Sequence, residues 1–344
     1  MKIRYSMNRL FQIALLLAAM LLPRAGQTAE DQGVSGAFLQ LNRQAAGQTA
    51  EQWKTLLTRM RAIGIDTLIV QWTAEAPVLY FKDQDLDFKE QFDTIERLME
   101  AERGLRFSIF LGLQNDPAFW KEITARDKAL RDYFLERQAQ NERIQAALLK
   151  TFGQRDDWVG YYIPDEIDDL SWRDAGRRQL LKDYLHATVR SLRKHDTHRT
   201  IAISAFFRAR TAPTAVAETW NALTADTGLD YLLLQDGAGN NDPEDDVLPL
   251  YYQALLNLRR EHAPELWAVL EAFRRTSGNA EPFAAQPAPP DDFGRQIRAA
   301  AGFKRRVLFT FPDYVDPERG AAARALYQSL GGFSGLLEKT GSMP

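Results

Sequence analysis

The sequence predicts an α/β protein in which eight strand–helix units close into a (β/α)8 barrel. Short apolar segments typical of buried strands alternate with helical segments eight times between residues 35 and 330. The strand segments are apolar almost throughout, as expected for a parallel sheet that helices cover on the outside. A TIM barrel accommodates this order of elements in a single domain, expected here over residues 30–330.

The first four units have recognisable boundaries. Thr49 can cap the first helix, and Gly64, Gly104 and Gly153 end the first three helices. Pro164 ends the fourth strand because it lacks a backbone donor. The strands are expected at 35–41, 65–72, 105–113 and 159–163, and the helices at 49–63, 88–103, 127–152 and 171–195.

The last four units continue the alternation. Pro213 is suited to the first turn of the fifth helix, and Pro264 lies beyond the end of the sixth. The strands are expected at 200–206, 229–235, 266–272 and 306–311, and the helices at 212–225, 246–262, 291–302 and 318–330. A doubly wound open sheet is the alternative, but the chain has no G-x-G-x-x-G or Walker motif for its phosphate turn.

The chain begins with a segment that predicts export. Lys2, Arg4 and Arg9 precede an apolar stretch from Leu10 to Leu22, and Ala29 precedes the acidic Glu30. Residues 1–29 are therefore expected to be a cleaved signal peptide, which implies a periplasmic or secreted protein without a membrane anchor. An uncleaved N-terminal anchor is the alternative. Residues 331–344 are expected to form a poorly ordered C-terminal tail.

Composition excludes several functions. The chain has no cysteine, which excludes disulfides, thiolate metal sites and a cysteine nucleophile. Residues 1–29 contain four basic residues and no acidic one, so their removal changes the net charge from −3 to −7. A protein this acidic has no general electrostatic reason to bind nucleic acid or anionic lipid.

Polar and aromatic residues collect where the apolar strands end, which is the active-site end of such barrels. The acidic run that follows Ile163 supplies Asp165, Glu166 and Asp168. It could instead be a solvated loop that also caps the next helix through Asp169 or Ser171. The expected catalytic residues are Glu166 and Glu271. The expected substrate-binding residues are Gln40, Gln71, Trp72, Gln114, Asn115, Asp165, Asp168, Arg208, Gln235, Asp236 and Tyr314.

Glu271 ends the otherwise apolar segment 267–270, a position that packing alone rarely gives to a carboxylate. An ion pair with Arg208, Arg274 or Arg275 is the alternative explanation. Strands four and seven lie on opposite sides of an eight-stranded mouth. Two carboxyl groups placed there suit glycoside hydrolysis, in which one protonates the leaving oxygen and the other attacks the anomeric carbon.

Glutamates that end strands four and seven resemble those of clan GH-A, a large clan of retaining glycoside hydrolases. Segments 36–40, 64–72 and 160–168 also resemble a bacterial family of uncharacterised exported barrels described as glycoside hydrolase-like. This resemblance implies that Glu166 is the acid/base and Glu271 the nucleophile. The clan usually has Asn before the acid/base, to bind the sugar 2-hydroxyl, whereas this chain has Asp165.

Two functions are consistent with these patterns. The first is an exported glycoside hydrolase-like barrel that cleaves a poly- or oligosaccharide by a two-glutamate retaining mechanism. The second is a non-catalytic carbohydrate-binding barrel that assists the machinery for synthesis or export of a surface polysaccharide. Neither requires a cofactor or a metal, and the four histidines all fall on helices or at helix ends, away from the expected mouth.

Overall fold

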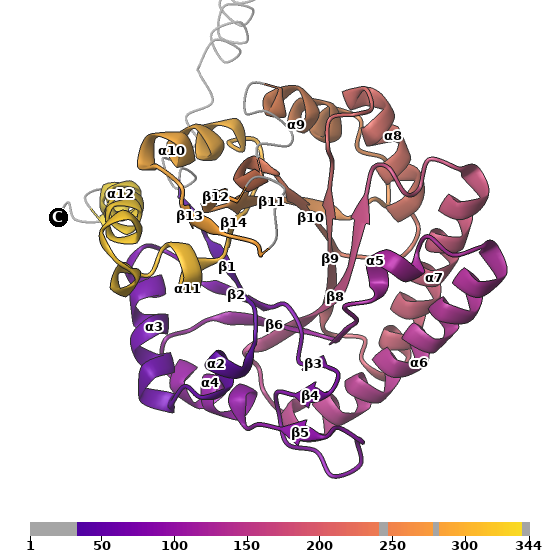
Figure 1. The fold of residues 1–344 in the computed structure, drawn as a ribbon, viewed down its shortest axis with the longest axis horizontal. Coiled ribbons are helices and arrows are strands. Elements are labelled where there is room, and N and C mark those ends of the chain that lie inside the picture. The colour runs from indigo at the N-terminus through magenta and orange to yellow at the C-terminus, as the bar shows by residue number, and fades with distance from the viewer. Residues whose placement is uncertain (1–32, 241–246, 278–281, 339–344) are drawn as a thin grey trace, which may run out of the picture.

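Eight parallel strands close into a barrel, as the sequence predicts (Figure 1). The computed structural model describes residues 33–240, 247–277 and 282–338. Around the barrel the strand order is β1, β2, β6, β8, β9, β10, β11 and β14. Their bounds are Gly36–Leu39, Thr67–Val70, Ser108–Gly112, Trp158–Asp168, Thr200–Phe206, Tyr231–Gln235, Glu265–Glu271 and Arg306–Phe309.

A ring of helices surrounds the barrel (Figure 1), and each expected helix has its counterpart. Thr49 and Gln52 form a capping box at the start of α3, as the sequence pattern suggests. The ring consists of α3 (Ala50–Ala62), α4 (Thr94–Glu102), α6 (Asp127–Phe152), α7 (Ala175–His195), α8 (Pro213–Thr224), α9 (Leu248–Asn257), α10 (Pro290–Ala299) and α12 (Ala321–Glu338).

Short elements in the loops add to this plan. A small sheet contains β3 (Ala74–Glu75), β4 (Val78–Leu79), β5 (Glu90–Gln91) and β7 (Gln114–Asn115), and β12 (Phe273–Arg275) pairs antiparallel with β13 (Ala285–Pro287). The remaining elements are α2 (Arg43–Ala46), α5 (Phe119–Glu122), η2 (Ala238–Asn240), α11 (Phe311–Tyr314) and η3 (Pro317–Arg319). Strands of two or three residues are too short to show a periodic pattern in the sequence.

Several predicted boundaries are wrong. The fourth strand does not end at Pro164 but continues to Asp168, because Pro164 lies in a register shift between Ile163 and Ile167, where the regular ladder is interrupted. The helix expected at 246–262 already ends at Asn257.

The helix expected from residue 88 begins at Thr94, because Glu90 and Gln91 belong to β5. The cap of α7 is Asp174 instead of Asp169 or Ser171, because Asp168 accepts the backbone N–H of Ser171 and keeps that residue in a loop. The last helix continues to Glu338, past residues 331 and 332, since glycine weakens a helix by only about 1 kcal/mol.

The core has two layers that follow the alternation of side chains along the strands. One layer fills the barrel and includes Phe38, Phe110, Tyr162 and Trp267. The other lies between the barrel and its helices. In β8, Tyr162 belongs to the inner layer, whereas its neighbours Tyr161 and Ile163 belong to the outer one.

The predicted signal peptide, residues 1–29, lies outside the described residues, as does the end of the chain after Glu338. Within the described ranges, no helix is long and apolar enough to span a membrane.

Candidate active site

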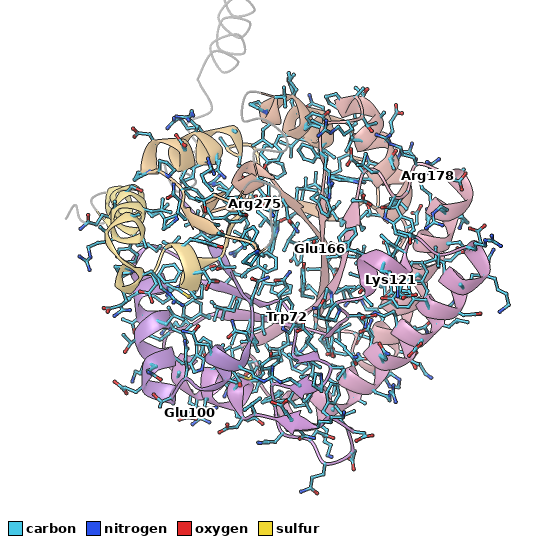
Figure 2. The ribbon with its side chains drawn as sticks, in the orientation of Figure 1. Trp72, Glu100, Lys121, Glu166, Arg178 and Arg275 are labelled. Carbon is cyan, nitrogen blue, oxygen red and sulfur yellow. The ribbon has the colours of Figure 1, made fainter. Side chains whose placement is uncertain are left out.

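The alternation along β8 places Glu166 at the mouth of the barrel. Tyr162, four residues before Glu166, belongs to the layer inside the barrel, and the next residue after Glu166, Ile167, belongs to the outer layer. Because side chains alternate along a strand, Glu166 points to the inside. Glu166 accepts a 2.7 Å hydrogen bond from the side-chain amide of Gln235, which ends β10. This bond reaches past the intervening strand β9. Figure 2 shows Glu166 and Trp72 over the barrel, inside the ring of helices.

Burial raises the pKa of Glu166 to about 7, and the hydrogen bond from Gln235 opposes this rise. A carboxyl group with such a pKa holds its proton for a substantial part of the time at neutral pH. It can therefore serve as a general acid and, after losing the proton, as a general base.

Glu271 ends β11 and is 6% exposed. Its carboxylate accepts a 2.7 Å hydrogen bond from the backbone N–H of Gly239 in η2. Burial raises the pKa of Glu271 to about 8, and repulsion from Asp236 and Glu166 adds to the rise. The Gly239 bond and the charge of Arg274 oppose it. Among the groups that raise the pKa of Glu271, Glu166 therefore makes a smaller contribution than Asp236.

Gly239 approaches Glu271 so closely that a side chain could not be added without movement. A Cβ atom built there would lie 2.6 Å from the Glu271 carboxylate and 2.4 Å from the Phe273 ring. Sequence analysis missed this residue. The only local signal is the cluster of small residues, Gly237 to Gly239, that follows β10.

Asp236 is fully buried beside Glu271, so it organises the site instead of lining it. Its carboxylate accepts 3.1 Å bonds from the backbone N–H groups of Glu271 and Ala238, and a 2.5 Å bond from the Gln296 side chain. Burial raises the pKa of Asp236 to about 6. The prediction that Asp236 binds substrate is therefore wrong, because a fully buried carboxylate cannot touch a ligand at the mouth. Gln296, which sequence analysis missed, lies 60 residues away on α10.

Asp165 faces away from the mouth, contrary to the prediction that it binds substrate beside Glu166. Its carboxylate forms a 2.9 Å ion pair with Arg137 of α6 and accepts a hydrogen bond from the hydroxyl of Tyr184 of α7. Asp165 and Glu166 are adjacent, so their side chains point to opposite faces of β8. Sequence analysis missed Arg137 because it lies within a long helix with no sign of its buried position.

The predicted amide residues divide into two groups. Gln40 donates a 2.8 Å bond to Gln71, which is 6% exposed, and the two form a pair at the ends of β1 and β2. Gln114 and Asn115 instead form β7 in the small sheet, where Asn115 donates to Glu75. The structure thus places Gln40 and Gln71 with the barrel strands and the other two amides in a loop.

The remaining predicted residues lie on the rim. The Trp72 indole donates a 2.9 Å bond to the carbonyl of Leu41, which fixes the ring. Asp168 accepts bonds from the backbone of Leu170 and Ser171, which shapes the loop after β8. Arg208 is exposed, with its guanidinium 5.7 Å from the centre of the Phe206 ring. Tyr314 packs on Phe273, with their ring centres 5.0 Å apart.

An aromatic pair stands beside this rim. Trp120 of α5 contacts Phe206, which ends β9, with ring centres 5.4 Å apart. Trp120 is 42% exposed, which is unusual for so large an apolar side chain. Among the described residues, no group of three or more His, Asp or Glu side chains is arranged to hold a metal ion.

The chain is a closed (β/α)8 barrel of the TIM type, with Glu166 near the end of its fourth strand and Glu271 at the end of its seventh. The chain belongs to the DUF4434 family, a domain of unknown function, whose sequence profile matches residues 34–321. It is 29% identical over 273 residues to the uncharacterized protein YbcH of Escherichia coli K12, covering 79% of this chain and 87% of YbcH.

Solved structures with the same fold are glycoside hydrolases by name. A Bacteroides thetaiotaomicron protein, provisionally described as an alpha-L-fucosidase, matches with a TM-score of 0.70 and 16% identity, over 91% of this chain and 99% of its own. A Thermoanaerobacterium saccharolyticum xylanase matches with a TM-score of 0.52 and 10% identity, over 86% of this chain and 95% of its own. A Rhizomucor miehei endo-1,4-beta-mannanase matches with a TM-score of 0.53 and 8% identity, over 88% of this chain and 95% of its own. These similarities establish the fold.

Proposed function

We propose that this protein is a retaining glycoside hydrolase in which Glu166 is the acid/base and Glu271 the nucleophile. The observation that carries the proposal is the position of two glutamates at the barrel mouth, Glu166 near the end of β8 and Glu271 at the end of β11. These are the fourth and seventh strands of the barrel. The side chain of Gln235 holds the first carboxyl group and the backbone N–H of Gly239 holds the second. Buried structural carboxylates are ordinarily paired with a cation, whereas within the described residues Glu166 accepts its side-chain hydrogen bond from the neutral amide of Gln235.

In the first step, the Glu271 carboxylate attacks the anomeric carbon and forms a glycosyl ester. The bond to the leaving oxygen breaks, and that oxygen takes the proton of Glu166. In the second step, the Glu166 carboxylate removes a proton from water, and the water oxygen attacks the same carbon. The ester bond breaks, which restores the Glu271 carboxylate and leaves the proton on Glu166.

The electrostatics of the site determine where this proton lies. With pKa values raised to about 7 and about 8, Glu166 and Glu271 together hold at least one proton at neutral pH. Burial and repulsion from Asp236 and Glu166 outweigh the Gly239 N–H and the Arg274 charge, so the free site holds this proton more tightly on Glu271. The proposed roles therefore require the bound substrate to move it to Glu166. A glycosidic oxygen placed against Glu166 would favour the proton on that residue.

A second candidate is a non-catalytic barrel that binds a surface polysaccharide during its synthesis or export. The observation that favours it is the position of Asp165, which faces α6 and α7. The side chain before Glu166 is therefore not available for a sugar 2-hydroxyl at the mouth. In the hydrolase, Gln235 would take over this contact, because its amide already lies against Glu166.

Stereochemistry of the product tests the proposal. The mature protein should release a sugar whose anomeric configuration, followed by proton NMR during hydrolysis, equals that of the substrate. An experimental structure should place the two carboxyl groups about 5–5.5 Å apart, whereas about 6.5–9.5 Å would indicate inversion. Absence of turnover on a panel of bacterial polysaccharides, with binding retained, would favour the binding barrel.

We further propose that the protein acts in the periplasm or outside the cell on a carbohydrate substrate. The basic and apolar pattern of residues 1–29 supports export, and the net charge of −7 without them gives no reason for binding to nucleic acid or membrane. The polysaccharide synthesis or export machinery remains the partner expected for the second candidate.

A further inference from the structure

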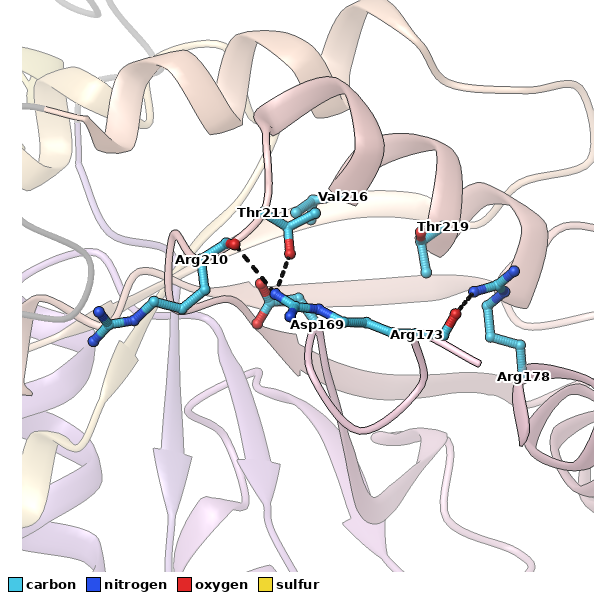
Figure 3. A pocket seen from close by; sticks show the side chains of 7 residues that line it. All are labelled: Asp169, Arg173, Arg178, Arg210, Thr211, Val216 and Thr219. Atoms are coloured by element: carbon cyan, nitrogen blue, oxygen red, sulfur yellow. Dashed lines mark hydrogen bonds between the residues drawn. The ribbon is translucent and has the colours of Figure 1, made fainter. Parts of the chain in front are cut away.

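A pocket of about 310 Å³ lies beside the barrel mouth, between the loops that follow β8 and β9 (Figure 3). Its volume is at the small end of the range for ligand sites. Three arginines contribute to it, although the net charge of the chain is negative. The pocket is lined by Asp169, Arg173, Arg178, Arg210, Thr211, Val216 and Thr219.

Arg173 is held in place within this pocket. Its Nη2 atom donates a 2.6 Å bond to the Thr211 hydroxyl and a 3.2 Å bond to the Arg210 carbonyl (Figure 3). The side chain is otherwise exposed. A guanidinium has five N–H donors, so these two bonds fix its position without using its remaining donors. A fixed guanidinium is well suited to bind a planar or tetrahedral oxyanion.

Asp169 provides an independent indication of a ligand. The residue is 5% exposed, and one carboxylate oxygen accepts a 3.2 Å bond from the backbone N–H of Arg208. The other oxygen, Oδ2, is buried and has no hydrogen-bond partner among the described residues. A buried acceptor without a donor is unfavourable. A hydroxyl group of a ligand in the pocket would satisfy it.

We propose that this pocket is a subsite for an acidic sugar unit of the glycan. The acid group, a carboxylate, sulfate or phosphate, binds the guanidinium of Arg173, with Arg178 contributing positive charge. A neighbouring sugar hydroxyl donates to Oδ2 of Asp169. The inference rests on the proposed function, because it names the class of substrate that the same mouth would receive.

The position of the pocket fits a neighbouring sugar unit. Asp169 follows Glu166 by three residues, so their Cα atoms are at most about 11 Å apart. The mouth itself carries Glu166 and Glu271, whose negative charge in the ionised form would repel an acidic polymer. Positive charge at the adjacent subsite offsets this repulsion and fixes the polymer relative to the two glutamates.

Calorimetry on the mature protein can test the subsite, with an oligogalacturonate and its methyl-esterified form as a pair that differs in charge. A sulfated and a phosphorylated oligosaccharide, each beside its neutral parent, form the other arms. At least one acidic form should bind about tenfold or more tightly than its neutral partner, and the preference should weaken with added salt. The arm that shows it identifies the acid group.

Variants locate the preference. Arg173→Gln should bring the ratio of acidic to neutral affinity close to one, and Arg173→Lys should retain only part of it. Asp169→Asn removes the acceptor for the sugar hydroxyl but also a negative charge beside Arg173, so it should weaken the neutral form more than the acidic form. Arg190→Gln is the control, because Arg190 is exposed and lies about three turns beyond Arg178 on α7. It removes the same charge and should change neither affinity.

Equal affinity for acidic and neutral forms in every arm would overturn the subsite, as would an unchanged ratio in Arg173→Gln. These results do not depend on turnover. Hydrolysis of neutral glycans without charge preference would leave the proposed function intact and remove the subsite. Charge-selective binding without hydrolysis of any glycan would support the subsite and contradict the proposed hydrolase function.

Discussion

Arg137 and Asp165 form an ion pair of 2.9 Å on the outer side of β8, and neither side chain is more than 2% exposed. The hydroxyl of Tyr184 donates to the second carboxylate oxygen of Asp165. These contacts attach β8 to both α6 and α7 immediately before Glu166. The strand is therefore anchored at the residue that determines which way the proposed acid/base points.

Asp165→Asn should destabilise the fold by about 3–5 kcal/mol, because it leaves the Arg137 charge buried without its partner. The free energy of unfolding in urea measures this loss. Asp85→Asn is the control, since Asp85 is 79% exposed in its ion pair with Lys150 and should matter by less than about 1 kcal/mol. Equal stability of the two variants would show that the buried pair does not anchor the strand.

Glu166→Gln and Glu271→Gln should separate the two proposed roles. Glu166→Gln should slow cleavage of substrates with poor leaving groups by about 10²-fold or more, because these need a proton, and affect activated aryl glycosides much less. Glu271→Gln should abolish turnover of both substrates. Steady-state kinetics measures each effect, with the exposed Glu218→Gln as control. If both variants keep wild-type rates on both substrates, neither residue carries the assigned role.

The raised pKa of Glu271 predicts how stability depends on pH. The folded state binds the proton of Glu271 up to about pH 8, whereas the unfolded chain releases it near pH 4.3. The stabilising contribution is therefore complete below about pH 4.3 and is lost as the pH rises through about 8. Glu271→Gln should flatten the fall in melting temperature between pH 5 and 8, whereas the exposed Glu100→Gln should not. A steeper fall in Glu271→Gln would contradict the assignment.

Gly239→Ala should impair the site more than the fold. The added Cβ would lie within 2.6 Å of the Glu271 carboxylate and of the Phe273 ring, so η2 or Glu271 must move. We expect activity to fall by about tenfold or more, since a displacement near 1 Å can cost even more than this. Gly33→Ala, with no atom within 4 Å of the new Cβ, is the control for both activity and melting temperature. Wild-type activity in Gly239→Ala would show that its N–H does not position the nucleophile.

The mature protein should begin near Glu30 and accumulate in the periplasm or the medium, because residues 1–29 have the composition of a secretory signal. N-terminal sequencing of the protein from fractionated cells checks this expectation. Recovery of a chain that retains Met1 in the cytoplasmic fraction would exclude export.

Local patterns in the sequence were sufficient to predict the barrel. Each barrel strand combines an apolar run with a turn signal, so its approximate position can be read without knowledge of the rest of the chain. The same patterns identify Glu166 and Glu271, because both end such runs. Period-two alternation from Tyr162 could also have assigned Asp165 to the outer face of β8.

Other features of the site depend on contacts between distant segments. The bond from Gln296 to Asp236 joins α10 to the end of β10, and no local pattern distinguishes Gln296 from a glutamine on the exposed face of a helix. The 2.7 Å bond from Gly239 to Glu271 likewise depends on how η2 packs against β11. Such positions follow from tertiary packing, which a single sequence does not specify residue by residue.

Closure of the barrel has a consequence for the behaviour of the protein at high concentration. Each barrel strand is paired on both sides, so none offers a free row of backbone donors and acceptors to a second molecule. In the described parts of the chain, the free strand edges belong to the two small sheets, whose strands have two or three residues each. Edges this short are poor templates for strand addition. The folded protein should therefore resist aggregation through β-pairing, even where crowding is severe.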